Sequence, residues 1–417
     1  MVVVKIAAAE ESAARVEEGV MVIREYDEER DKVAVEELER RCEVGGGRRG
    51  KPSLVTDLMG DPICRVRHFP THIMLVAEYG EENEIVGVVR GCVKNATRGS
   101  SLYVKLAYIL GLRVSPTHRR LGIGTKLVEQ LEKWCKEKGA EYAYMATDCT
   151  NEPSINLFTK KCDYTKFRTP TMLVQPVHAH SKPIPLSIAI IRVPQKLAAS
   201  MYCQIFANSE FFPKDIDAIL ASKLNLGTFM AVPKNSLPKW DPRKTMFPPS
   251  FALLSVWNTK EVFKLQLKGV SALTYACCEG SRVLDAWMPW LRLPSFPDVF
   301  RQFGVYFMYG LHMEGKQGVR LMRSLCTFAY NMARDDGGCG AVVAEVSQRD
   351  PVRVAIPHWR KFSLAEDLWC IKKLATLHGA REKETSTTTA MAERFEPSDW
   401  TSSRSSSPVI FVDPRDF

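Results

Sequence analysis

Residues 107–138 read AYILGLRVSPTHRRLGIGTKLVEQLEKWCKEK, and this stretch decides the fold. Its first part, Ala107–Val114, is a nearly continuous apolar run that stops at Ser115-Pro116, as a buried strand does. From Thr125 onward, apolar residues recur at the spacing of one helical face, with lysines and glutamates between them. The stretch therefore predicts a buried strand, a tight basic turn and one long amphipathic helix.

The turn Arg119–Thr125 carries the residues that can bind an anion. The first amides of a helix have no intrahelical partner and lie at the positive end of the helix dipole. Glycines at 122 and 124 let a ligand approach the backbone closely, and Arg119 and Arg120 add positive charge at the rim. A glycine-relieved turn with two solvated arginines is the alternative. The flanking strand and the phased helix favour a pyrophosphate site.

Two motifs carry a family resemblance. Arg119-x-x-Gly122-x-Gly124 resembles the R/Q-x-x-G-x-G/A motif with which the GNAT superfamily of N-acetyltransferases grips the pyrophosphate of acetyl-CoA. Residues 151–158, NEPSINLF, resemble the next motif of that superfamily, N-x-x-A/S-x-x-L-Y. The superfamily resemblance covers about the first 180 residues. Nearly the whole chain is similar to the plant hookless-type N-acetyltransferases, through HRR-x-GIG, FRTP and the closing PVIFVDPRDF.

The resemblance implies an α/β fold with one mixed sheet, in which the fourth and fifth strands splay apart and the pantetheine arm of the coenzyme pairs in the gap like an extra strand. It implies acetyl-CoA as co-substrate, with no metal, and an amine of a protein or small molecule as acceptor. It also implies a role in hormone-responsive growth. The coenzyme-binding residues that it implies are Leu112, Val114, Arg119, Arg120, Leu121, Gly122, Ile123, Gly124, Thr125, Asn151 and Phe158.

The catalytic positions depart from the family pattern. Many relatives carry a glutamate base on the fourth strand, where this chain has Leu110, and a tyrosine acid where it has Phe158. Asp148, acting through water, and Tyr144 are the candidate catalytic groups, and Cys149 is a weaker one. The sequence thus predicts coenzyme binding with slow acetyl transfer. The alternative from another class is a non-catalytic acetyl-CoA-binding scaffold or sensor.

Composition limits the remaining classes of function. The net charge of +9 arises from 57 basic and 48 acidic residues without a long basic run, which favours a mixed-charge surface over direct binding to nucleic acid. No apolar run is long enough for a membrane span or a signal peptide, so we expect the nucleus or the cytoplasm. Twelve cysteines without a C-x-x-C pair indicate reduced thiols and no metal site.

The length of 417 residues predicts two domains and a tail. The second half repeats the order of the first: a strand, a glycine-bearing turn, a long helix, a strand and a helix opened by proline. Gly122 precedes Asn151 by 29 positions, and Gly318 precedes Asp350 by 32. Because the second turn lacks the arginine and the G-x-G, we expect no second coenzyme site. An unrelated α/β domain is the alternative to a repeat.

The predicted boundaries follow from these patterns. They are a flexible N-terminus (1–19), a GNAT domain (20–178), a linker (179–185), a degenerate GNAT-like domain (186–379) and a low-complexity tail (380–417). The strand pattern over 164–177 should finish the first sheet. The closing PVIFVDPRDF is expected to add a strand to an exposed edge.

Overall fold

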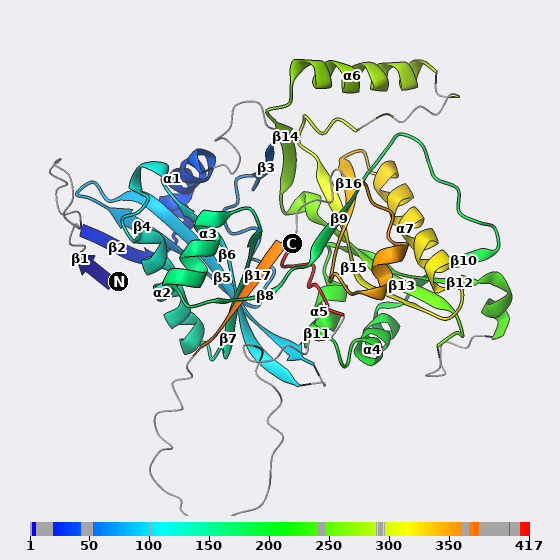
Figure 1. Cartoon of the computed structure of the whole chain (residues 1–417), viewed down its shortest axis with the longest axis horizontal. Helices are drawn as coiled ribbons and strands as arrows, with labels where there is room; N and C mark the ends of the chain where they lie inside the picture. Colours follow the sequence, from blue (N-terminus) through cyan, green and yellow to red (C-terminus); the bar gives the residue numbers. More distant parts are fainter. Residues whose placement is uncertain are drawn as a thin grey trace, which may run out of the picture.

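Two sheets face each other across a large apolar core in the computed structural model (Figure 1). The structure describes residues 2–5, 20–42, 53–99, 102–239, 247–288, 290, 295, 297–360, 367–374, 400 and 409–417. The predicted GGGRRG connection (45–50) and most of the 380–407 segment lie outside these ranges.

The first sheet contains the predicted strand–turn–helix unit. Its strands run in the order β1 (Val2–Lys5), β2 (Val20–Glu25), β4 (Thr71–Tyr79), β5 (Glu84–Arg98), β6 (Tyr103–Val114), β7 (Tyr142–Asp148), β17 (Asp367–Lys373) and β8 (Thr165–Arg168), with β11 (Glu210–Pro213) on β5. The pair β6–β7 is parallel and the other pairs are antiparallel. This arrangement confirms the predicted mixed sheet with a parallel fourth and fifth strand.

Helices cover both faces of this sheet, one on the face that carries Met74 and Val76 and another on the face that carries Leu75 and Ala77. Helix α1 (Glu28–Arg41) begins at Asp27, whose side chain accepts hydrogen bonds from the amides of Glu29 and Arg30. Helix α2 (Ile123–Glu137) follows the turn η1 (Pro116–His118) and buries an apolar face that includes Leu127, Val128, Leu131 and Cys135. A short helix, α3 (Glu152–Asn156), continues into the π-helical turn η2 (Leu157–Lys161).

The second sheet repeats this plan. Its strands run in the order β10 (Ile188–Val193), β12 (Asn225–Pro233), β13 (Phe251–Asn258), β15 (Gly304–Glu314), β16 (Cys339–Val346) and β9 (Thr171–Pro176). Only β15–β16 is parallel among these described pairs, as β6–β7 is in the first sheet. The helices are α4 (Gln195–Ile205), α5 (Ile216–Ala221) and α7 (Gly318–Asp335), and a 3₁₀ turn, η6 (Pro351–Ala355), follows β16.

A shared irregularity supports the repeat. In β6 the register against β5 shifts next to Gly111, whose φ is +61°, and in β15 the register against β13 shifts next to Gly310, whose φ is +59°. Only glycine adopts this left-handed conformation readily. Asn151 caps α3, and Asp350 caps η6 in the same way. The prediction of a second GNAT-like unit is therefore supported by topology, bulge and cap together.

The two halves exchange strands, which the sequence did not predict. Residues 171–176 were expected to finish the first sheet, but β9 pairs with β16 in the second sheet. In return β17, from the predicted second domain, lies between β7 and β8 in the first sheet. A boundary at 179–185 therefore does not separate the two sheets. Both strands are short apolar runs that fit either sheet edge, so local patterning does not distinguish the two placements.

Both ends of the chain also differ from expectation. Val2–Lys5, within the predicted flexible segment, forms β1 against β2. The closing residues 409–417 do not add a strand to an exposed edge. Ile410 makes one isolated parallel bridge to Glu210, and Val409–Phe411 and Asp416 lie between the two sheets. Aromatic side chains pack against Phe411, and the buried Lys94 pairs with Asp413 and Asp416. These contacts explain why the closing residues lie between the sheets.

An insertion projects from the second sheet between β13 and β15. It contains β14 (Lys264–Lys268), which pairs with β3 (Ser53–Asp57) from the first half, and helix α6 (Ala272–Trp287), which stands away from the sheets in Figure 1. Within the described residues, no helix is long and apolar enough to cross a membrane.

Candidate functional site

A fork opens where the parallel strands β6 and β7 part. Their pairing runs from Leu106–Tyr142 to Ile109–Met145 and ends there. Beyond this point β6 continues to Val114 against β5, and β7 continues to Asp148 against β17. Each strand thus turns one backbone edge toward the gap, where an extended ligand could pair as an added strand.

The start of α2 forms an open cradle at the end of this fork. Gly122 precedes the helix with φ +79°, and among the described residues no atom lies within 4 Å of the place where its Cβ would stand. No side chain caps the helix and its first turn carries no acidic residue within the described structure. The free amides and the helix dipole are therefore available to an anion.

The fork and the cradle share one groove of about 1570 Å³. This volume exceeds that of an ordinary small-molecule site and suits a long ligand. Basic side chains line the groove, with Glu129 and Glu152 as its acidic members; the basic ones are Arg41, Arg113, Arg119, Arg120, Lys126, Lys160 and Lys161. Of these, only Arg119 and Arg120 were predicted. The adjacent Lys160-Lys161 after the second motif is a sequence signal that could have indicated two of the others.

The structure brings most of the predicted coenzyme residues into this groove. They are Leu112, Val114, Arg119, Arg120, Gly122, Ile123, Gly124, Thr125, Asn151 and Phe158. Leu121 lies outside the lining and packs against the core under α2. Asn151 caps α3 by accepting a hydrogen bond from the amide of Ser154 at 3.3 Å.

The two candidate catalytic residues lie apart from each other. The Tyr144 side chain is buried between the sheets, and its hydroxyl donates a hydrogen bond of 2.6 Å to Asp416. Burial, followed by the Asp416 charge, raises the pKa of Tyr144 well above its ordinary value, so this phenol stays protonated. Asp148 is exposed at the end of β7 and accepts a hydrogen bond from the amide of Thr150 at 2.7 Å. Neither belongs to the groove lining, and Cys149 beside Asp148 is also exposed.

Apolar side chains occupy the middle of the fork. Leu110 and Phe158 both line the groove and are buried, and Phe158 packs edge to face against Tyr164 at 5.2 Å. Neither side chain can accept or donate a proton. The fork itself therefore offers backbone and apolar contacts, with polar groups at its rim.

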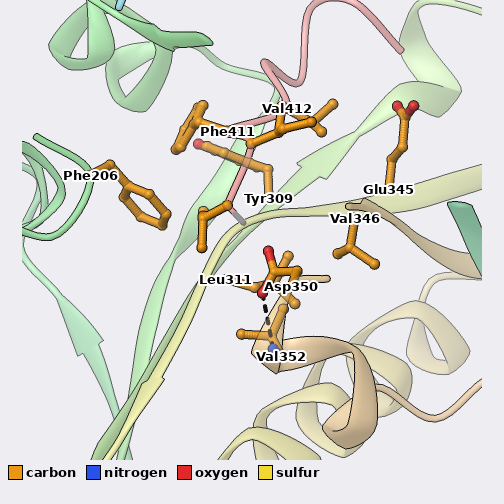
Figure 2. Close-up of a pocket in the computed structure, with 12 residues that line it drawn as sticks. Phe206, Tyr309, Leu311, Glu345, Val346, Asp350, Val352, Phe411 and Val412 are labelled. Atoms are coloured by element: carbon orange, nitrogen blue, oxygen red, sulfur yellow. Dashed lines mark hydrogen bonds between the residues drawn. The ribbon is translucent and has the colours of Figure 1, made fainter. Parts of the chain in front are cut away.

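The second half has a fork of the same design, filled by the chain itself. Pairing of β15 with β16 ends at Met308–Ala344. Figure 2 shows the small cavity that remains, closed by Phe411 and Val412 of the C-terminal segment and by Phe206. Before α7, a Cβ on Gly315 would stand 2.1 Å from the carbonyl oxygen of Pro249. Gly315 is thus packed where Gly122 is open, although the start of α7, like that of α2, has no side-chain cap and no acidic residue in its first turn within the described structure.

Metal binding gains no support in the part of the chain that the structure describes. It contains no group of three or more histidine, cysteine or acidic residues that could hold a metal ion. His180, in the predicted linker, lies with its Nε2 atom 2.7 Å from Asp285.

Comparison with known proteins agrees with this geometry. Residues 34–164 match the acetyltransferase (GNAT) family. The chain is 48% identical over 420 residues to the probable N-acetyltransferase HLS1 of Arabidopsis thaliana, covering 95% of this chain and all of that protein. It is 44% identical to the acetyl transferase GW6a of Oryza sativa subsp. japonica, over 84% of this chain and 90% of that protein.

A solved structure resembles both sheets together. It is the N-myristoyltransferase of Saccharomyces cerevisiae with bound myristoyl-CoA, at a TM-score of 0.51 and 9% identity, covering 88% of this chain and 81% of the other. At this identity the likeness concerns the fold alone.

Proposed function

Because this chain belongs to the acetyltransferase (GNAT) family, with the hookless-type probable N-acetyltransferases among its relatives, we propose that it transfers the acetyl group of acetyl-CoA to an amine. The coenzyme would lie in the groove of the first fork. The observation that carries the proposal is the continuity of the open cradle at Gly122 with the two free strand edges beyond Ile109 and Met145.

The residues of the groove fit the parts of such a coenzyme. The first amides of α2, with Arg119 and Arg120 at the rim, suit a pyrophosphate. The lysines at 160 and 161 and the arginine at 41 suit a further phosphate. Apolar side chains such as Leu112 and the strand edges suit a pantetheine arm. When bound, acetyl-CoA supplies the thioester whose acyl carbon the amine attacks.

The residues around the thioester position suggest slow proton transfer. In the family pattern a base stands where this chain has Leu110 and an acid stands where it has Phe158, and both side chains line the groove. Asp148, reached through water, remains the candidate base that the sequence offers. If water or Asp148 removes the proton, the rate should rise with pH toward the pKa of the acceptor, about 10.4 for a lysine-like amine.

Leu110 and Phe158, which cannot transfer protons, also favour a second candidate, a non-catalytic scaffold or sensor that binds acetyl-CoA. A broad panel of amines separates the two, because only the enzyme releases free coenzyme A in their presence. Phe158→Tyr should raise that release if its hydroxyl reaches the leaving sulfur, since a positioned acid contributes about 10²–10⁴-fold. The hookless resemblance supports extending the proposal to hormone-responsive growth.

Calorimetric titration with acetyl-CoA tests the coenzyme assignment. Arg119→Ala should weaken binding roughly 10- to 100-fold, the effect of losing one charge-assisted hydrogen bond. Arg320→Ala is the matched control, because Arg320 lies in the first turn of α7, outside the lining of the coenzyme groove, and bonds Ser187. Equal affinity for both variants and the wild type would refute the pyrophosphate site.

A further inference from the structure

A buried arginine lies directly behind the bulge of the first fork. Arg90, on β5, is 3% exposed, and its register partner on β6 is Leu110. Its guanidinium donates hydrogen bonds to the carbonyl oxygens of Gly111, at 3.2 Å, and of Pro62, at 2.5 Å. A cation at this depth is costly unless its surroundings compensate it, and an apolar side chain would fill a buried strand position without that cost. The groups that Arg90 bonds therefore matter.

Glu39 on α1 compensates the charge of Arg90. Its Oε1 atom lies 2.8 Å from Arg90 Nη1, and its Oε2 atom lies 3.3 Å from Nε of Arg113, an arginine that lines the coenzyme groove. The guanidinium thus joins three parts of the first half, which are helix α1, the segment at Pro62 and the bulge of β6. Because its donors form a rigid planar fork, these contacts hold the Gly111 carbonyl in one position.

The peptide that joins Gly111 to Leu112 is matched to no residue of the neighbouring described strands. The register of β6 against β5 skips both bulged residues, as a bulge does, and the parallel pairing with β7 has ended before them. Both residues line the coenzyme groove. Since Arg90 bonds the carbonyl of this peptide, the group that the peptide can still offer to a ligand is its amide, on Leu112.

The corresponding bulge of the second fork is backed by an uncharged ring. A Cβ on Gly310 would stand 2.7 Å from the ring of Tyr202, much as a Cβ on Gly111 would stand 2.6 Å from Arg90 Nη1. The Tyr202 hydroxyl bonds Ser255 at 2.7 Å, and the side chain is buried. Packing behind a bulge therefore needs no charge in this fold. The guanidinium occurs at the bulge that lines the open groove.

We propose that Arg90 is a positioning residue for the thioester of acetyl-CoA. By bonding the Gly111 carbonyl, it fixes the bulge and polarises the peptide, so that the Leu112 amide becomes a stronger donor to the thioester oxygen. This inference rests on the proposed acetyl transfer and adds a residue that does not itself touch the substrate. Because Leu110 and Phe158 cannot transfer protons, stabilising the charge that develops on this oxygen is what the fork can contribute.

The proposed contact acts on one stage of the transfer. The amine nitrogen forms a bond to the acyl carbon, and the π electron pair of the thioester carbonyl moves to its oxygen. A hydrogen bond from the Leu112 amide is strongest at this stage, because its acceptor then carries negative charge. When the electron pair returns, the carbon–sulfur bond breaks and the coenzyme leaves as a thiolate, while the amine proton passes to water or Asp148. The Arg90 guanidinium stays protonated throughout.

Two matched ligands test this role with the full chain. Acetyl-CoA and S-ethyl-CoA are nearly equal in size, but only acetyl-CoA carries the carbonyl oxygen. Arg90→Lys keeps the charge beside Glu39 but lacks the planar fork that bonds Pro62 and Gly111 together. In calorimetry, its affinity for acetyl-CoA should fall roughly 3- to 10-fold further than its affinity for S-ethyl-CoA, the effect of one ordinary hydrogen bond. Arg90→Met, which also removes the charge, should show at least as large a difference.

Infrared difference spectroscopy gives a readout that a merely structural role would not move. A hydrogen bond to the thioester oxygen lowers the stretching frequency of that carbonyl, which isotope labelling of the acetyl group identifies in the complex. The lowering on binding should be smaller in Arg90→Lys than in the wild type. Tyr202→Phe is the matched control, because it removes a buried hydrogen bond behind the second bulge. It should lower the melting temperature and leave the affinity difference and the carbonyl frequency unchanged.

Three outcomes would overturn the inference. The first is that both Arg90 variants weaken the two ligands equally or not at all. The second is an unchanged carbonyl frequency in Arg90→Lys, and the third is the same affinity difference in Tyr202→Phe. If the methionine variant does not fold, the lysine variant still decides, because it keeps the cation that pairs with Glu39. If the wild type binds neither ligand, the proposed function fails first, and the two failures are thereby distinguished.

Discussion

The two forks of this molecule share a backbone design and differ in what fills them. Parallel pairing ends at Ile109–Met145 in the first and at Met308–Ala344 in the second, each beside a left-handed glycine in the bulged strand. In the first half, a Cβ on Gly122 would meet open space within the described structure. In the second half, Gly315 has the same φ of +79° but is packed against Pro249 and Ser250.

This difference shows that the ligand site does not follow from the fold alone. The C-terminal segment closes the second fork, and the loop before β13 packs against Gly315, which precedes α7. The first fork keeps both open and surrounds them with basic side chains. Four comparisons between the halves test this contrast, beginning with the C-terminal segment that reaches both forks.

The largest effect is expected at the ion pair that fixes the C-terminal segment. Lys94 is buried among Asp413 and Asp416, and although burial lowers the pKa of Lys94, these two carboxylates raise it above the ordinary value overall. Lys94→Met should cost about 3–5 kcal/mol of unfolding free energy, because it leaves a buried carboxylate without its cation. Urea unfolding measures this loss.

A second lysine provides the control. Lys260 pairs with Asp336 in the second half, where both side chains are partly exposed. Lys260→Met should cost at most about 1 kcal/mol. Similar losses for the two variants would mean that the C-terminal segment is not held by its buried charges.

The two left-handed glycines should respond differently to a methyl group. Gly315→Ala combines a strained φ with overlap of the Pro249 backbone and should cost about 2–5 kcal/mol of stability. Gly122→Ala has the strain without the overlap and should cost about 1–2 kcal/mol. Thermal unfolding together with acetyl-CoA titration should show that alanine at 122 weakens coenzyme binding, whereas alanine at 315 does not once the chain is folded.

Coenzyme affinity should separate the two helix starts further. A Cβ on Gly124 would stand 3.5 Å from Leu157 and 3.6 Å from Val114, both groove residues, so Gly124→Ala places a methyl group in the ligand's path. We expect affinity for acetyl-CoA to fall about tenfold, or about 1.4 kcal/mol. Gly318→Ala, at the start of α7, should leave the affinity unchanged. Equal effects at both positions would indicate a second coenzyme site.

The last comparison concerns a cap that differs between the halves, Asn151 in the first and Asp350 in the second. Burial raises the pKa of Asp350 from 3.8 to about 6. The folded chain therefore binds this proton more tightly than the unfolded chain, and the wild type loses stability as the pH rises from about 4 to about 6. Asp350→Asn should remove this loss, roughly 3 kcal/mol for a rise of about two pKa units, so its advantage over the wild type should be larger at pH 7 than at pH 4 in urea unfolding.

The first fork could largely be predicted from the sequence because its signals are local. Ser115-Pro116 ends a strand, Gly122 opens a helix, and Asn151 caps the next one, all within about 45 residues. The strand exchange could not be predicted in this way. Thr171–Pro176 and Asp367–Lys373 have compatible apolar patterns, and only contacts distant in sequence assign each to its sheet.

The buried charges between the two sheets left only a weak signal in the sequence. Glu345 is the single charged residue in the apolar run Ala341–Val346, and such an isolated acid in a buried strand favours a functional role. Asp416 gave no comparable indication, because the basic residues around its partner Lys94 are as typical of an exposed loop as of a strand. Strand β5 instead continues to Arg98, which places that lysine inside the protein.

Strand β17 completes the first sheet but is synthesised long after β7, the strand that it pairs with. Asp148 on β7 and its partner Asp367 are 219 positions apart. At ribosomal rates of roughly 5–20 residues per second, the edge of β7 waits roughly 10–45 s for its neighbour. An unpaired edge of this kind recruits other strands, so nascent chains should depend on a chaperone during that interval. A fragment of residues 1–180 keeps the cradle but remains permanently in the unfinished state.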